Sequence, residues 1–298
     1  MLRASQSKAA SAFVLACLLA GACVAGETAG EGGGGADGPG AGAGPGATTG
    51  AQGGGFGATT GTGGSGGGEP EIAEVYGHSA ATLYRLDPIT KAVTTVGNFA
   101  GCSSVIDIAL DKDSKLIGTT FDGIYTIDKA TAQCSLITSG SYPNSLSFIP
   151  EGTLDPNVEA LVGYEGDQYV RIDPTTGSKQ LIGSLGDGGL VSSGDVVSVK
   201  GGKSFLTVTG FDCPTDCLIE INPVTGAMVN NWGPLGYSAV YGIAFWAGSV
   251  YGFSEAGQLF EVSFPNQVLM TTLITQPPGT QFWGAGSTTS APPDPVPE

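Results

Sequence analysis

LYRLDPITKAVTTVG, residues 83–97, decides the fold of this 298-residue chain. Apolar and polar residues alternate up to Leu86, Asp87 and Pro88 open a short polar turn, and a second alternating run ends at Gly97. Alternation with a period of two indicates strands, and the Asp-Pro step indicates a turn between them. The stretch is therefore predicted to form a β-hairpin.

The hairpin pattern occurs five times along the chain. The further copies are IYTIDKATAQCSLI (124–137), YVRIDPTTGSKQLIG (169–183), LIEINPVTGAMVNN (218–231) and the degraded LFEVSFPNQVLM (259–270). The Asp position of the motif passes from Asp87 to Asp128, Asp173, Asn222 and Ser263, at spacings of 41, 45, 49 and 41 residues. Such a period, with four strand-like runs in each repeat, is typical of propeller blades. Because Asn222 replaces the carboxylate, the repeated Asp is interpreted as a hydrogen-bonding turn residue.

A second pair of strand-like runs precedes each later hairpin. These pairs are 104–110 with 115–120, 144–148 with 159–164, 195–199 with 205–209, and 241–245 with 249–253. With strands named a to d outward from the axis, the chain begins with a b-type strand at 72–77 and ends with an a-type strand at 282–288. We predict an all-β, five-bladed propeller over residues 70–290, closed by a three-plus-one blade that uses both ends. Such closure removes free sheet edges.

The repeated pattern resembles secreted bacterial propeller repeats of the NHL, YVTN and quinoprotein-like kinds. The resemblance covers residues 71 to 290 and is specific to architecture. It implies a protein that binds, scaffolds or senses, although some members of these families are hydrolases or glycosidases. It transfers no catalytic residue to this chain.

The N-terminal residues are typical of an exported, lipid-anchored protein. Arg3 and Lys8 precede an uncharged apolar run, 9–22, of signal-peptide length. LAGAC (19–23) resembles a bacterial lipobox, so residues 1–22 are read as a lipoprotein signal peptide and Cys23 as the lipidated residue. The alternatives are an ordinary secretory signal or lipidation at Cys17. The lipobox reading places the protein at the bacterial outer membrane or cell surface, and the secretory reading makes it secreted or periplasmic.

Composition separates a tether from the domain. Residues 26–68 contain 22 glycines and no Lys or Arg, so we expect residues 23–69 to be a flexible tether and the Pro-rich 291–298 to be disordered. The whole chain has a formal charge of −16. Such acidity argues against nucleic acid and against anionic lipid headgroups, so we expect no nucleic-acid partner and contact with a membrane only through the anchor. A monomer is expected.

Four cysteines lie in the repeat region: Cys102, Cys134, Cys213 and Cys217. An even number in an exported protein predicts disulfides, and zinc is disfavoured because only one close pair exists. Cys213 and Cys217 close a short loop, which leaves Cys102 for Cys134. In an ideal blade these two lie three strand spacings of about 4.8 Å apart, whereas a disulfide needs Cα atoms within about 7 Å. Either the d–a crossover carries Cys102 outward over the sheet, or one cysteine stays free.

Candidate site residues occupy two places. Asp107, Asn144 and Asp195 lie near the starts of inner strands, where carboxylates could hold Ca²⁺ or serve as acid and base; the alternative is hydrogen bonding within the channel. The d–a loops carry aromatic residues that could stack on a sugar or peptide or plug the channel rim. These are Phe99, Tyr142, Tyr237, Phe282 and Trp283. His78, the only histidine, is expected to be solvated in a b–c loop.

Function is therefore expected to be binding. The main hypothesis is a lipid-anchored, surface-displayed propeller that binds a protein, peptide or glycan on its loop face without catalysis and without a cofactor. The alternatives are a channel-centred hydrolase or glycosidase, in which Ca²⁺ takes part, and a purely structural envelope protein. No complete catalytic set of residues is identified.

Overall fold

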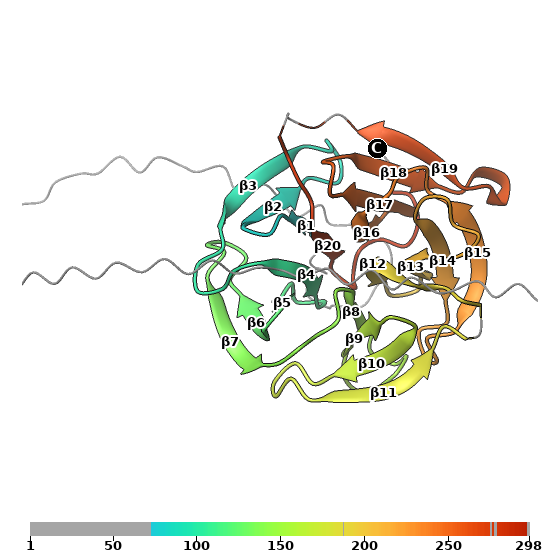
Figure 1. The fold of residues 1–298 in the computed structure, drawn as a ribbon. Helices are drawn as coiled ribbons and strands as arrows, with labels where there is room; N and C mark the ends of the chain where they lie inside the picture. Colours follow the sequence, from blue (N-terminus) through green and yellow to red (C-terminus); the bar gives the residue numbers. More distant parts are fainter. Residues whose placement is uncertain (1–72, 187, 275, 277–278, 297–298) are drawn as a thin grey trace, which may run out of the picture. The chain divides into compact units, whose positions relative to one another are not determined.

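The alternating runs of the sequence form twenty strands in five four-stranded antiparallel sheets, arranged as the blades of a propeller (Figure 1). The computed structural model describes residues 73–298, except 187, 275, 277–278 and 297–298. The predicted signal peptide (1–22), Cys23 and the tether (23–69) lie outside the described residues. Within the described part, no helix is long and apolar enough to cross a membrane.

Four blades are continuous in sequence, and their strands run outward from the axis. The first and second of these blades comprise β4 (Val105–Leu110), β5 (Leu116–Thr120), β6 (Gly123–Ile127) and β7 (Cys134–Ser139), and then β8 (Leu146–Ile149), β9 (Ala160–Glu165), β10 (Gln168–Ile172) and β11 (Lys179–Ser184). The third comprises β12 (Val191–Ser198), β13 (Ser204–Thr209), β14 (Cys217–Ile221) and β15 (Met228–Pro234). The fourth comprises β16 (Val240–Trp246), β17 (Ser249–Ser254), β18 (Leu259–Ser263) and β19 (Met270–Ile274). A short 3₁₀ turn, η1 (Pro265–Gln267), joins β18 to β19. The inner strands are almost entirely buried, whereas the residues of the outermost strands are mostly exposed or half-buried.

The fifth blade confirms the predicted closure. Its order is β20 (Gly284–Ser287), β1 (Val75–His78), β2 (Thr82–Leu86) and β3 (Val93–Asn98). The C-terminal strand β20 pairs antiparallel with β1, from Val75 opposite Ser287 to His78 opposite Gly284. The first and last strands of the described chain are thereby hydrogen-bonded in one sheet, and this blade closes the ring.

The repeated Asp acts as the turn residue that the sequence indicates. Asp87 Oδ1 accepts hydrogen bonds from the backbone N–H groups of Ile89 and Thr90, at 2.9 and 3.0 Å. Asn222 Oδ1 accepts the equivalent pair two and three residues on, at 2.8 and 3.2 Å. A neutral side chain does the same work as a charged one, so the motif is structural.

Each c–d turn also contacts the preceding blade. The hydroxyl of Tyr164 donates to Gly226 O at 2.7 Å, and that of Tyr169 donates to Pro223 O at 3.0 Å. In the closing blade, the Lys91 ammonium donates to the Tyr251 hydroxyl. The opening motif therefore joins neighbouring blades in addition to forming two strands of its own.

The path of a d–a crossover explains how a disulfide joins Cys102 to Cys134, which lie 32 residues apart in sequence. The crossover after β3 runs out along the start of β7, where Ala100 forms a parallel bridge with Gln133 and the Cys134 N–H donates to Ala100 O at 2.7 Å. Cys102 is thereby carried outward, its Cα lies 5.6 Å from that of Cys134, and the two are bonded. The Cys213–Cys217 disulfide also forms. Both predicted pairings are present.

The Pro-rich end differs from the expectation of a disordered tail. Ala291 is buried in the core shared by the last blades, and the Ala247 N–H donates to Pro292 O at 2.8 Å. Residues 291–293 therefore pack against the domain, whereas residues 294–296 are exposed. The β16–β17 turn supplies a partner that the local composition does not reveal.

Candidate functional site

Two carboxyl groups lie at the centre of the ring, on inner strands of non-adjacent blades. Asp107 on β4 and Asp195 on β12 are both fully buried. Asp107 accepts hydrogen bonds from the N–H of Ile108 at 2.8 Å and from that of Leu146, on the next blade, at 2.6 Å. Each Asp thus ties its own strand to the inner strand of a neighbour.

Asp195 repeats this arrangement on β12. It accepts the N–H groups of Val196 at 2.6 Å and of Ile243, on β16, at 2.7 Å. Burial, followed by the charge of Asp195, raises the pKa of Asp107 well above its usual range. Burial likewise raises the pKa of Asp195. Two buried carboxylates in contact repel each other, and this repulsion adds to the effect of burial on the pKa of Asp107.

The third predicted inner-strand residue does not join this pair. Asn144 is exposed and lies in the loop before β8. All four oxygens of Asp107 and Asp195 already accept a backbone N–H, whereas Ca²⁺ takes six to eight oxygen ligands. No group of three or more His, Cys, Asp and Glu side chains in the described residues is arranged to hold a metal. The predicted oxygen set therefore does not fit Ca²⁺.

His78 corrects the sequence-based expectation of a solvated loop residue. It is the last residue of β1 and is fully buried. Its Nδ1 donates to Ser79 O at 2.9 Å, and Nε2 has no hydrogen-bond partner. Burial lowers the pKa of His78 to about 4, so the ring is neutral. A Cβ on Gly284 would lie 2.3 Å from Nε2 and 2.6 Å from Asp107 Oδ1, which places the histidine beside the carboxyl pair.

Most of the predicted aromatic rim packs between blades. Phe282 is fully buried and meets the rings of Tyr84 and Phe253 edge-on, so its ring does not reach the surface. The half-buried Tyr237 stacks on Phe260 of the next blade, with ring centroids 4.2 Å apart.

The two remaining crossover aromatics with a packing partner follow the same pattern. The hydroxyl of Tyr142 donates to Gly177 O, in the c–d turn of the next blade, at 2.9 Å. Phe99 packs against the core that contains Cys134. Trp283 is only half-buried, with its backbone N–H donating to His78 O. Of the five predicted residues, Trp283 is the one beside the channel mouth without a described ring contact.

Two exposed phenylalanines escaped the sequence-based prediction. Phe121 lies in the β5–β6 loop and is 70 % exposed, and Phe211 lies in the β13–β14 loop and is 99 % exposed. Both loops are b–c connections. The Cys213–Cys217 disulfide restrains the second loop. Neither residue belongs to the repeated motif. A bulky apolar residue inside an otherwise polar turn is the sequence feature that could have indicated both.

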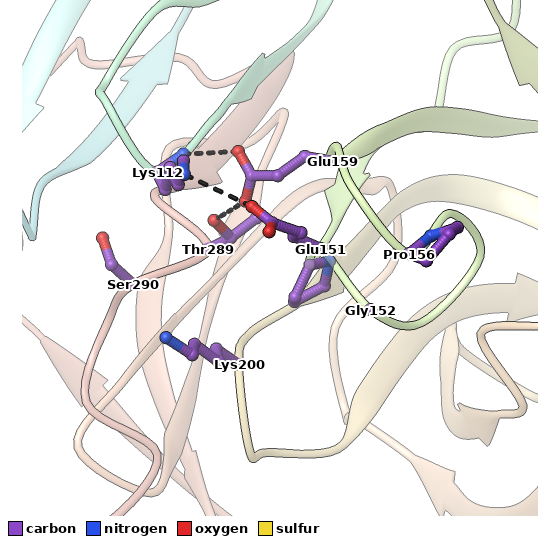
Figure 2. A pocket seen from close by; sticks show the side chains of 9 residues that line it. Lys112, Glu151, Gly152, Pro156, Glu159, Lys200, Thr289 and Ser290 are labelled. Carbon is purple, nitrogen blue, oxygen red and sulfur yellow. Dashed lines mark hydrogen bonds and ion pairs between the residues drawn. The ribbon is translucent and has the colours of Figure 1, made fainter.

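A pocket of about 380 Å³ lies at the other mouth of the ring, among the a–b connections (Figure 2). Its lining comes from the turns after β4, β8 and β12 and from the segment after β20. Glu159 accepts the Lys112 N–H at 2.8 Å and the Thr289 hydroxyl, and the Lys112 ammonium pairs with Glu151 at 3.4 Å. Four blades therefore contribute to one polar cavity.

No family model matches this chain, and no curated protein matches it. Among solved structures, it is similar to hydrazine synthase of Kuenenia stuttgartiensis (12 % identity, TM-score 0.37), covering 68 % of this chain and 62 % of that one. It is also similar to the PQQ-bound aldose sugar dehydrogenase of Streptomyces coelicolor (15 % identity, TM-score 0.40), covering 70 % of this chain and 79 % of that one. A third similar structure is an auxiliary nutrient binding protein of Bacteroides thetaiotaomicron (13 % identity, TM-score 0.42), covering 70 % of this chain and 56 % of that one. The chain thus spans about three fifths of the hydrazine synthase chain.

Proposed function

We propose that this chain is a lipid-anchored, surface-displayed propeller that acts as a non-enzymatic binding or scaffolding module. The face formed by its b–c loops contacts the partner, which is a protein, peptide or glycan. The observation that carries the proposal is the display of Phe211, 99 % exposed on a loop restrained by a disulfide.

The physical argument concerns the cost of binding. Ordering a mobile loop and its side chains on association reduces affinity, and a crosslinked loop has less freedom to lose. Aromatic side chains are enriched at binding surfaces and in the few positions that contribute most binding energy. Phe121 adds a second exposed ring on another b–c loop.

The channel supports a binding role over a catalytic one. Asp107 and Asp195 are fully buried, and each carboxyl oxygen accepts a backbone N–H, so neither side chain faces a substrate. A general acid or base must lie within hydrogen-bond reach of the reacting group. The formal charge of −16 favours partners other than nucleic acid.

Glycan and peptide arrays probed with the protein purified in detergent test this role. We expect a ligand on one array, and we expect Phe211→Ser to weaken its binding about tenfold or more, as at an aromatic hot spot. Leu181→Ser is the matched control, because Leu181 is 60 % exposed on the outer strand β11. Silence on both arrays would favour a structural envelope protein, and equal losses in both variants would refute the assigned face.

Mass spectrometry of the mature N-terminus tests the anchor separately. A lipid-modified Cys23 as first residue is the expected result. Cleavage elsewhere with an unmodified cysteine would indicate a secreted or periplasmic protein.

A further inference from the structure

The pocket at the a–b mouth has no part in the proposed function, because the b–c loops lie on the opposite face of the propeller. Its lining includes two lysines, Lys112 and Lys200, and two glutamates, Glu151 and Glu159. The whole chain has 11 Lys and Arg residues against 27 Asp and Glu. A cavity with equal numbers of both charges therefore departs from the acidic average.

Part of this pocket is fixed and part is exchangeable. Glu159 is held by the Lys112 N–H and the Thr289 hydroxyl, so its carboxyl group forms a rigid wall. The Lys112–Glu151 ion pair is different, because the two side chains are 53 % and 46 % exposed and lie 3.4 Å apart. An exposed pair of this kind contributes little, so a ligand can replace either partner at small cost.

The charges lie on different sides of the cavity. Figure 2 shows Lys200 across the pocket from Glu151 and Glu159, with Ser290 near the lysine. Lys200 and Ser290 also make interactions of their own, which a ligand would exchange for contacts to itself. The cavity therefore offers a cation at one end and a carboxylate at the other.

We propose that this pocket binds a small zwitterion, either a free amino acid or a dipeptide. Its carboxylate lies at Lys200 and its ammonium group at Glu151. A simple anion would meet two glutamates and a chain of charge −16, and a simple cation would meet two lysines. A neutral molecule with both charges avoids both penalties. The volume of about 380 Å³ falls in the range of small-molecule sites.

Isothermal titration calorimetry of the full protein with Ala-Ala and with alanine tests the proposal. N-acetyl-Ala-Ala and Ala-Ala amide, each lacking one charge, are the matched ligands. We expect one of the zwitterions to bind and both blocked peptides to bind about tenfold more weakly or worse, since a hydrogen bond to a charged group contributes that much.

Three variants identify the groups involved. Lys200→Gln and Glu151→Gln are expected to weaken binding about tenfold, whereas Lys115→Gln, which removes an equal charge outside the pocket lining, leaves it unchanged. If Lys200→Gln fails to fold, the half-exposed Glu151 still decides the outcome. Absence of binding by both zwitterions, equal binding of a blocked peptide, or an equal loss in Lys115→Gln would overturn the proposal.

Discussion

Asp195→Asn removes one of the two carboxyl groups that meet at the channel. Asp195 accepts the N–H groups of both Val196 and Ile243, and an amide has only one oxygen, so one N–H loses its acceptor. Leaving a buried donor unsatisfied costs about 1–3 kcal/mol. The variant is also freed of the like-charge contact with Asp107, so its stability should depend differently on pH.

The sign of this dependence follows from proton binding. Because its pKa is raised, the native pair binds protons more tightly than unfolded Asp side chains, whose pKa is about 3.9. The free energy of unfolding therefore falls by about 1.4 kcal/mol per pH unit from the unfolded pKa up to the native pKa of the pair. His78 acts oppositely, because its native pKa of about 4 lies below its unfolded value of 6.5. Stability from this residue rises with pH between these two values.

In the wild type the carboxyl pair and His78 therefore contribute opposite slopes between about pH 4 and 6.5: the pair lowers the free energy of unfolding as pH rises, and His78 raises it. In Asp195→Asn the remaining carboxyl ionises beside an amide that can donate to it, and only burial still raises its pKa, so the decline becomes shallower and the deficit of the variant shrinks as pH rises. Urea unfolding at constant ionic strength measures both profiles. Asp173→Asn, in an exposed c–d turn where Asn222 serves the same role, is the control. Parallel wild-type and Asp195→Asn profiles above the unfolded Asp pKa of about 3.9 would refute the reasoning.

Three other changes test the packing. Gly284→Ala would place a Cβ 2.3 Å from His78 Nε2, so we expect a loss of about 1–3 kcal/mol in thermal unfolding, whereas Gly188→Ala, with open space around it, should change little. Replacing Cys102 and Cys134 by Ala should lower the free energy of unfolding in guanidinium by about 3–4 kcal/mol. The same replacement of Cys213 and Cys217 should lower it less, because that disulfide spans 4 residues instead of 32. Equal losses would contradict the loop-entropy argument. Tyr164→Phe deletes a buried hydroxyl that donates to Gly226 O and should cost about 1–2 kcal/mol, measured by urea unfolding.

The ring itself was predictable because its signals are local. Alternation around Asp87-Pro88 marks two strands and a turn, and its recurrence at Asp128, Asp173 and Asn222 marks the blades. The unpaired strand at each end of the repeat region then requires the closing blade, and β1 and β20 do pair.

Contacts between blades were not predictable from the same pattern. The aromatic rings of Tyr237 and Phe282 pack between neighbouring blades, so their burial depends on how adjacent blades lie against each other. His78 is buried although it was expected to be solvated: it is the last residue of β1 and lies opposite Gly284 of β20, so it belongs to the closing blade and not to a loop.

The polar pocket also carries no local signal. Lys112, Glu159, Lys200 and Thr289 belong to four separate segments, and each is an ordinary polar residue in its own turn. Asp107 and Asp195, by contrast, were found from sequence because both lie near the predicted starts of inner strands. The sequence could not show that a backbone N–H would occupy every carboxyl oxygen.

Turnover tests most directly whether the buried carboxyl pair is structural and the protein a binding module. The purified protein, with Asp107→Asn and Asp195→Asn variants shown by circular dichroism to be folded, is assayed against a panel of glycosidase, esterase and peptidase substrates. We predict no turnover above the blank, or a background activity that is equal in all three proteins. Turnover by the wild type that either folded variant abolishes would contradict the account.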